Sequence, residues 1–260
     1  MSETEFQIIK SIGFVAALGL AAGAQRLYPH ARSGGSWQTN ALLWGTNAAI
    51  LGSVCAGCAC TVSLWASDAG YGLFNRAAVP AWLTIPATLV VLDLVSYFWH
   101  RANHHISVLW RFHQVHHSDP TFTVTTALRF HPGELLLALP VRLVAVALLG
   151  VSIPGVIVFE LIFALSNFVE HGDIDLPRWL EAKLERGLVT PALHRRHHSR
   201  ERKLLNSNYG TVFSLWDRAL GTYGGNRSQV HVRIGLPGLP ASPSVRDALL
   251  MPRRVYRGEA

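Results

Sequence analysis

The sequence predicts an all-α fold: an integral membrane helical bundle with a cytosolic-side cap of histidine-rich helices that holds two metal ions. Composition predicts the bundle, because half of the 260 residues are hydrophobic and only 15% are charged. The mean hydropathy is also positive, at +0.25, as is typical of membrane proteins. Histidine placement predicts the cap, since eleven of the thirteen histidines lie between His100 and His198.

Three apolar segments in the first hundred residues are expected to span the membrane. Residues 6–24 follow an acidic start rather than a basic one, so a membrane helix is favoured over a cleaved signal peptide. Residues 41–66 are uncharged and long enough for one tilted span. Residues 80–99 contain a single acid, Asp93, seven positions before His100. Two helical turns separate the pair, so we expect both on one helix face.

Two shorter apolar segments, 135–149 and 154–169, are joined by the turn GVSIPG. Each is shorter than the roughly 20 residues of a full span. The pair therefore forms a tilted hairpin that crosses and returns, or one that only dips into the bilayer. Arg142 favours a hairpin packed on protein.

The chain is divided into membrane-anchoring helices and loops (1–79), a metal-binding domain (80–223) and an irregular basic tail (224–260). From His171 onward there are fifteen Lys and Arg against eight Asp and Glu. Because positive charge collects in cytoplasmic loops, we expect this part and the histidine clusters inside. In a bacterial cell the membrane would be the inner one. No basic run alternates with stacking aromatics, which argues against nucleic acid as a partner.

Three cysteines, Cys55, Cys58 and Cys60, lie within one apolar stretch. The CAGC pair has redox or zinc spacing. Its apolar neighbours favour free cysteines that behave as small hydrophobic residues.

Most histidines fall into three clusters, HRANH, HQVHH and HRRHH. Spacings of three and four residues place side chains on one face of a helix. Neutral imidazole is a common metal ligand, and so many of them suggest more than one ion. The clustered histidines are His100, His104, His113, His116, His117, His194, His197 and His198.

Metal identity follows from the ligand set. Structural zinc takes four ligands and leaves no open position, whereas eight or more nitrogens fit two ions that keep open positions. HExxH, the metalloprotease signature, is absent. Iron and oxygen chemistry on an apolar substrate is the favoured reading. A membrane metal-binding or transport protein, and an inactive scaffold with a structural metal, are the alternatives.

Single histidines and nearby acids complete the candidate site. His171 is a further candidate ligand and His131 a weaker one, whereas His105, His30 and His231 are not expected to bind metal. Metal-bound imidazoles usually donate their second N–H to an acid or a carbonyl. The acids expected to orient ligands are Asp93, Glu134 and Asp217.

The chain resembles the fatty acid hydroxylase and sterol desaturase superfamily of membrane di-iron enzymes. The resemblance runs from Asp93 to Tyr223 through six ordered blocks: DLVSYFWHRANHH, LWRFHQVHHSDP, LRFHPGE, HGDIDLP, VTPALHRRHHS and NYGTVFSLWDRALGTY. Asp173 replaces the Asn of the family's HGN block, and Leu220 replaces an aromatic before Gly221. Neither departure removes a proposed ligand.

This resemblance implies two iron ions, with zinc as a substitute in purified protein, and O2 as co-substrate. It carries over His100, His104, His113, His116, His117, His171, His194, His197 and His198 as ligands. It implies hydroxylation or desaturation of a lipid such as a sterol or fatty acyl chain. Electrons are expected from a separate donor of the ferredoxin or cytochrome b5 type, with its reductase.

Overall fold

Helices dominate the computed structural model, which describes residues 2–31, 36–55, 57–225, 232–239 and 243–259. Within those ranges no strand forms, and extended pairing is limited to isolated bridges such as Pro29 with Ile174. The all-α prediction is confirmed. The helices are α1 (Glu3–Leu27), α2 (Trp37–Cys55), α3 (Cys58–Asp68), α4 (Leu73–Arg76), α5 (Ala81–His105), α6 (Ser107–His117), α7 (Pro132–Leu149), α8 (Ile153–Glu170), α9 (Arg178–Leu184), α10 (Pro191–His197), α11 (Arg202–Leu205), α12 (Leu215–Ala219) and α13 (Val245–Leu250), with 3-10 turns η1 (Val124–Leu128) and η2 (Met251–Arg253).

Five helical stretches in the described residues are long and apolar enough to cross a membrane: Glu3–Leu27, Trp37–Arg76, Trp82–His105, Pro132–Leu149 and Ile153–Glu170. Large apolar side chains on α1 face outward, with Ile12 and Leu20 exposed by 65% and 67%. Such exposure suits contact with lipid rather than water. The chain is thus organised as a multi-pass membrane protein.

The second predicted segment, 41–66, is divided between α2 and α3. Gly57 precedes α3 in the left-handed conformation (φ 76°), which a continuous right-handed helix does not contain. The Glu3 carboxylate lies 2.1 Å from where a β-carbon on Gly57 would stand. The segment expected to make one tilted span therefore consists of two helices within a single candidate span, Trp37–Arg76, and α1 approaches the chain closely at this glycine.

Helices α7 and α8 form the predicted hairpin. Gly150 ends α7 in the left-handed conformation (φ 69°), and the Ser152 side chain caps α8. Each helix has 18 residues, or about 27 Å at 1.5 Å per residue, close to the thickness of a bilayer core. Length and composition therefore suit a hairpin that crosses and returns.

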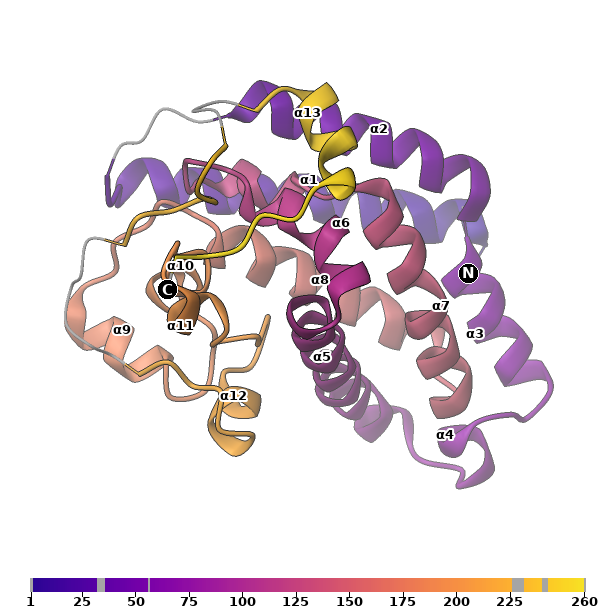
Figure 1. Cartoon of the computed structure of the whole chain (residues 1–260). Helices are drawn as coiled ribbons and strands as arrows, with labels where there is room; N and C mark the ends of the chain where they lie inside the picture. The colour runs from indigo at the N-terminus through magenta and orange to yellow at the C-terminus, as the bar shows by residue number, and fades with distance from the viewer. Residues whose placement is uncertain (1, 32–35, 56, 226–231, 240–242, 260) are drawn as a thin grey trace.

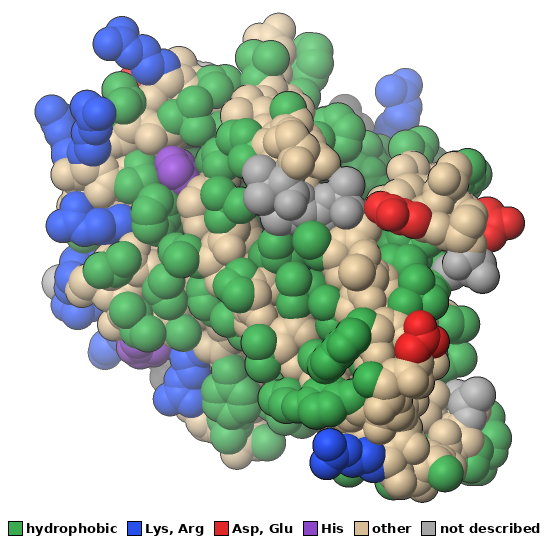
Figure 2. Space-filling view, turned by 90° about the vertical axis from the view of Figure 1, so that its right-hand side faces the viewer, with side chains coloured by type: hydrophobic (Ala, Val, Ile, Leu, Met, Phe, Trp, Pro, Cys, Tyr) green, Lys and Arg blue, Asp and Glu red, His purple; other side chains and the backbone are tan. Residues whose placement is uncertain are grey.

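Figure 1 shows α5 nearly end-on, with α1, α2, α7 and α8 around it and α9 to α12 gathered on one side. α5 continues beyond the apolar run 80–99 to His105, and therefore carries His100 and His104 at its end. Figure 2 shows a broadly hydrophobic face of the molecule. Most Lys and Arg side chains in that view gather along one edge, and the Asp and Glu side chains lie toward the other.

The basic tail is more ordered than expected. Ser244 and Asp247 form a capping box that starts α13, and Ala248 and Met251 pack against Leu43 of α2 and Val115 of α6. The amide of Gln114 donates to the carbonyl oxygens of Met251 and Arg254. The tail therefore covers α6, one of the histidine-bearing helices.

Candidate metal centre

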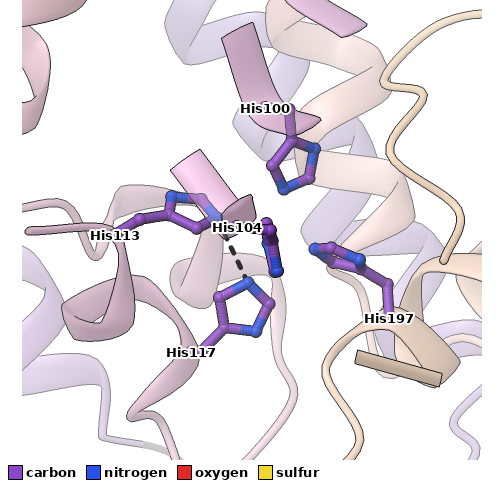
Figure 3. Close-up of side chains that lie close together, drawn as sticks. All are labelled: His100, His104, His113, His117 and His197. Atoms are coloured by element: carbon purple, nitrogen blue, oxygen red, sulfur yellow. Dashed lines mark hydrogen bonds between the residues drawn. The ribbon is translucent and has the colours of Figure 1, made fainter. Parts of the chain in front are cut away.

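The nine histidines predicted as ligands come together in two groups. In each group the nearest ring nitrogens all lie within 4.8 Å of one another. Group 1, drawn in Figure 3, has its rings pointing toward a common centre. Group 1 is His100, His104, His113, His117 and His197, and group 2 is His116, His171, His194 and His198.

Each HxxHH motif contributes to both groups. In α6 the first and last members, His113 and His117, belong to group 1, while His116 belongs to group 2. Successive helical residues are rotated by 100°, so positions i and i+4 are 40° apart and i+3 points elsewhere. In the second motif only His197 belongs to group 1, while His194 and His198 belong to group 2. Each HxxHH motif therefore contributes ring nitrogens to two neighbouring groups.

Backbone carbonyls hold several rings in a fixed orientation. Nδ1 of His100 lies 2.9 Å from the Tyr209 carbonyl oxygen, and Nδ1 of His197 lies 2.7 Å from that of Ser207. Nδ1 of His171 is 2.7 Å from the carbonyl oxygen of Asn167. Since a carbonyl oxygen only accepts, Nδ1 carries the proton in these rings and Nε2 presents a lone pair to its group.

Burial keeps these imidazoles neutral. It lowers the pKa of His171 to about 4 and the pKa of His197 to about 3. Burial also lowers the pKa of His116, His194 and His198 well below the usual value. The neutral ring is the form that binds metal ions, so the site is ready for a cation at neutral pH.

Unsatisfied nitrogens show that the residues fit metal ions. Nε2 of His100, Nε2 of His197 and both ring nitrogens of His104 are buried without a hydrogen-bond partner among the described residues. In group 2, the Nε2 atoms of His116 and His171 are 2.9 Å apart, although Nδ1 of each ring faces a carbonyl oxygen. Two lone pairs at that distance repel each other unless a cation binds both. Two nitrogens bonded at right angles to one ion, with bonds of about 2.1 Å, would lie about 3 Å apart.

One buried glutamate accompanies each group. Glu134, in the first turn of α7, has Oε1 2.8 Å from Nδ1 of His113 in group 1. Glu170, the last residue of α8, has Oε2 3.7 Å from Nδ1 of His194 in group 2. Glu134 is one of the three acids predicted to orient ligands, whereas Glu170 is not among those three.

Comparison with known proteins places this site within a family. The model of the fatty acid hydroxylase family matches residues 85–222, just over half of the chain. The chain belongs to the fatty acid hydroxylase family. The matched range includes all nine grouped histidines, and the recognition made from the six sequence blocks is confirmed.

Curated relatives of the chain include ornithine lipid hydroxylase OlsE from Rhizobium tropici, 31% identical over 58% of the chain and 44% of the relative. Human alkylglycerol monooxygenase is 32% identical over 62% of the chain and 35% of the relative. Human lathosterol oxidase is 26% identical over 59% and 47%. The chain thus spans less than half the length of these relatives. No solved structure matches the chain.

The other two predicted acids, Asp93 and Asp217, accept hydrogen bonds from the 209–216 segment rather than from histidines. Asp93 accepts from the N–H groups of Val212 and Phe213 and from the Trp216 indole. Asp217 accepts from the N–H groups of Tyr209 and Gly210. Asp217 reaches the site only through Tyr209, from whose N–H it accepts and whose carbonyl oxygen faces His100.

Three of the remaining histidines, His30, His105 and His131, belong to neither group. His131 caps the start of α7 by accepting from the Gly133 N–H. His105 is exposed and contacts the Tyr209 hydroxyl, and the exposed His30 lies 3.7 Å from Asp175. His231 lies outside the described residues.

Helices that precede the matched region also support the site. The Asn40 amide of α2 donates to Asp119, and its oxygen accepts from buried Arg129. The Arg129 carbonyl oxygen in turn lies 3.3 Å from Nδ1 of His116. The Gln25 side chain of α1 accepts from the N–H groups of Val124 and Asp173. No local motif marks these contacts, so sequence reasoning treated α1 and α2 only as anchors.

Proposed function

We propose that this protein is a di-iron lipid hydroxylase that uses O2. The observation that carries the proposal is the pair of convergent histidine groups inside the fatty acid hydroxylase region. Group 1 would hold one iron ion and group 2 the other. Bound iron would supply the redox chemistry that activates O2, and zinc could occupy the same nitrogens in purified protein.

The proposed reaction inserts one oxygen atom into a C–H bond of a lipid. The second oxygen atom leaves as water, which requires two electrons and two protons. The printed names of the relatives refer to ornithine lipids, alkylglycerols and lathosterol. A lipid substrate also suits a site at the ends of membrane helices, since α5 carries His100 and His104 in its last turns.

The protein's own residues would orient the ligands and exclude water. Glu134 and the carbonyl oxygens of Tyr209 and Ser207 fix the rings of His113, His100 and His197. Such partners turn each Nε2 toward its group before an ion arrives. Burial of the group 2 histidines and of His113, His117 and His197 would limit the access of bulk water to the open positions.

We place the histidine end of the bundle on the cytoplasmic side of the membrane, the inner membrane if the cell is bacterial. The Lys and Arg bias of the last ninety residues supports this orientation. A separate donor of the ferredoxin or cytochrome b5 type, with its reductase, would then deliver electrons from the cytoplasmic side, where the last ninety residues carry the excess of Lys and Arg.

The test combines metal content with product analysis on full-length protein in detergent. We expect about two iron ions per chain in the wild type, and one fewer in each of the variants His197→Ala and His194→Ala. His30→Ala is the matched control and should keep both ions. With 18O2 and an electron donor, a total lipid extract should yield a hydroxylated lipid that carries a single 18O atom. Absence of bound metal after iron reconstitution, or a product without 18O, would reject the proposal.

A further inference from the structure

A polar pocket of about 230 Å³ opens beside group 1. His104 of group 1 is one of the residues that line the pocket. Both of its ring nitrogens lack a hydrogen-bond partner among the described residues. It is smaller than the roughly 300–1,000 Å³ of sites that enclose a whole drug-sized ligand. The pocket therefore has room for a headgroup rather than an entire lipid. Its walls are formed by His104, His105, Ser107, Trp110, Arg202, Leu205, Asn206, Arg257 and Gly258.

Two arginines give the pocket a positive charge. Among the residues that the structure describes, no carboxylate lies within ion-pair distance of the Arg202 or Arg257 guanidinium. Glu201 and Glu259 are the acids nearest to them in the chain; neither forms an ion pair with them, and Glu259 pairs instead with Arg233 at 3.3 Å. Two guanidinium groups on one cavity form a site for carboxylate or phosphate oxygens.

Backbone hydrogen bonds join the two segments of chain that carry these arginines. The Arg202 N–H donates to the Glu259 carbonyl oxygen at 2.9 Å, and the Glu259 N–H donates to that of Arg200 at 2.7 Å. A β-carbon on Gly258 would lie 2.6 Å from the Arg200 carbonyl oxygen, so only glycine permits this approach. The backbone segments that carry Arg202 and Arg257 are therefore held together by the contacts of residues 258 and 259, and not by the flexible side chains alone.

The pocket also adjoins an apolar corner of the fold. Ile106 and Val108 flank the pocket residue Ser107 and are exposed by 51% and 61%. This corner joins α5, a membrane-spanning helix, to α6. An alkyl chain leaving the pocket can therefore follow exposed apolar side chains into the bilayer.

We propose that this pocket binds the anionic headgroup of the lipid substrate, a phosphate or a carboxylate, through Arg202 and Arg257. The inference rests on the proposed lipid hydroxylase function and adds the class of substrate. His104 lines the same cavity and belongs to group 1. The carbon that is oxidised therefore lies close to the headgroup rather than deep in the acyl chain.

Binding can be measured without turnover, on metal-loaded full-length protein in an uncharged detergent. The probes are dihexanoyl phosphatidate, dihexanoylglycerol as its counterpart without phosphate, and inorganic phosphate, each titrated by calorimetry. The test variant is Arg202→Gln with Arg257→Gln. Its matched control is Arg246→Gln with Arg253→Gln, which removes two exposed arginines of α13 and η2 outside the pocket.

We expect phosphatidate to bind wild type and control equally, and the test variant about tenfold or more weakly. Dihexanoylglycerol should bind poorly to all three proteins. Equal phosphatidate binding by the test variant, or no binding by the wild type, would overturn the proposal. Inorganic phosphate binding as tightly as phosphatidate would identify a free-anion site and reject the lipid headgroup. Metal content is measured on the same samples, so a failure of the proposed iron sites is recognised separately.

Discussion

Replacing Glu134 should weaken group 1 specifically. The buried Glu134 Oε1 lies 2.8 Å from Nδ1 of His113 and 3.2 Å from Nδ2 of Asn103. Loss of such a partner of a metal-bound histidine typically weakens metal binding 10- to 100-fold. Glu134→Gln keeps an acceptor oxygen but removes the charge, so we expect about tenfold, or about 1.4 kcal/mol. Glu134→Ala leaves both donors unpaired, so we expect about 100-fold.

The assay is stepwise extraction of iron by a chelator, followed by metal analysis of the protein. Glu134→Gln should lose one ion at a lower chelator concentration than the wild type, while the second ion is extracted as before. Asp93→Asn is the control, because Asp93 is also a buried acid with three donors but contacts no histidine. It should lower the Tm in detergent without shifting the extraction curve. An unchanged curve for Glu134→Gln, or a shifted one for Asp93→Asn, would refute this reasoning.

Three further predictions concern other parts of the site. Glu170→Gln should shift extraction of the other ion, that of group 2, because Glu170 approaches His194; a shift confined to group 1 would contradict this. His131→Ala should retain both ions by metal analysis, since His131 caps α7 and faces the Leu249 carbonyl oxygen but belongs to neither group, and loss of an ion would make it a ligand. Asn40→Ala should lower stability by about 3 kcal/mol, because buried Arg129 and Asp119 lose a partner; denaturation in detergent measures this, with the half-buried Thr46→Ala on the same helix as control.

The membrane character of this protein is determined by its sequence. Apolar segments long enough to span are visible because lipid requires a continuous run of apolar residues. The division of the second segment was missed, since a glycine in an apolar run predicts no break by itself. The close approach of the Glu3 side chain to Gly57 is a tertiary contact. Helix α13 was missed for a different reason: Ser244 and Asp247 have capping-box spacing, and this local signal was overlooked in a tail rich in glycine and proline.

The sequence also determined which histidines to consider, because the motif spacing selects eight of them and the family resemblance adds His171. Their division between two groups required the packing of α6 against α10, which directs His116 and His117 to different groups. The acids show the same limit. Asp93 and His100 both face the 209–216 segment, but seven helical residues put them about 10 Å apart along α5. Sharing a helix face therefore did not bring Asp93 within hydrogen-bond reach of His100. Only the tertiary structure decides which groups meet, because a hydrogen bond depends on distances of a few tenths of an ångström that sequence spacing does not fix.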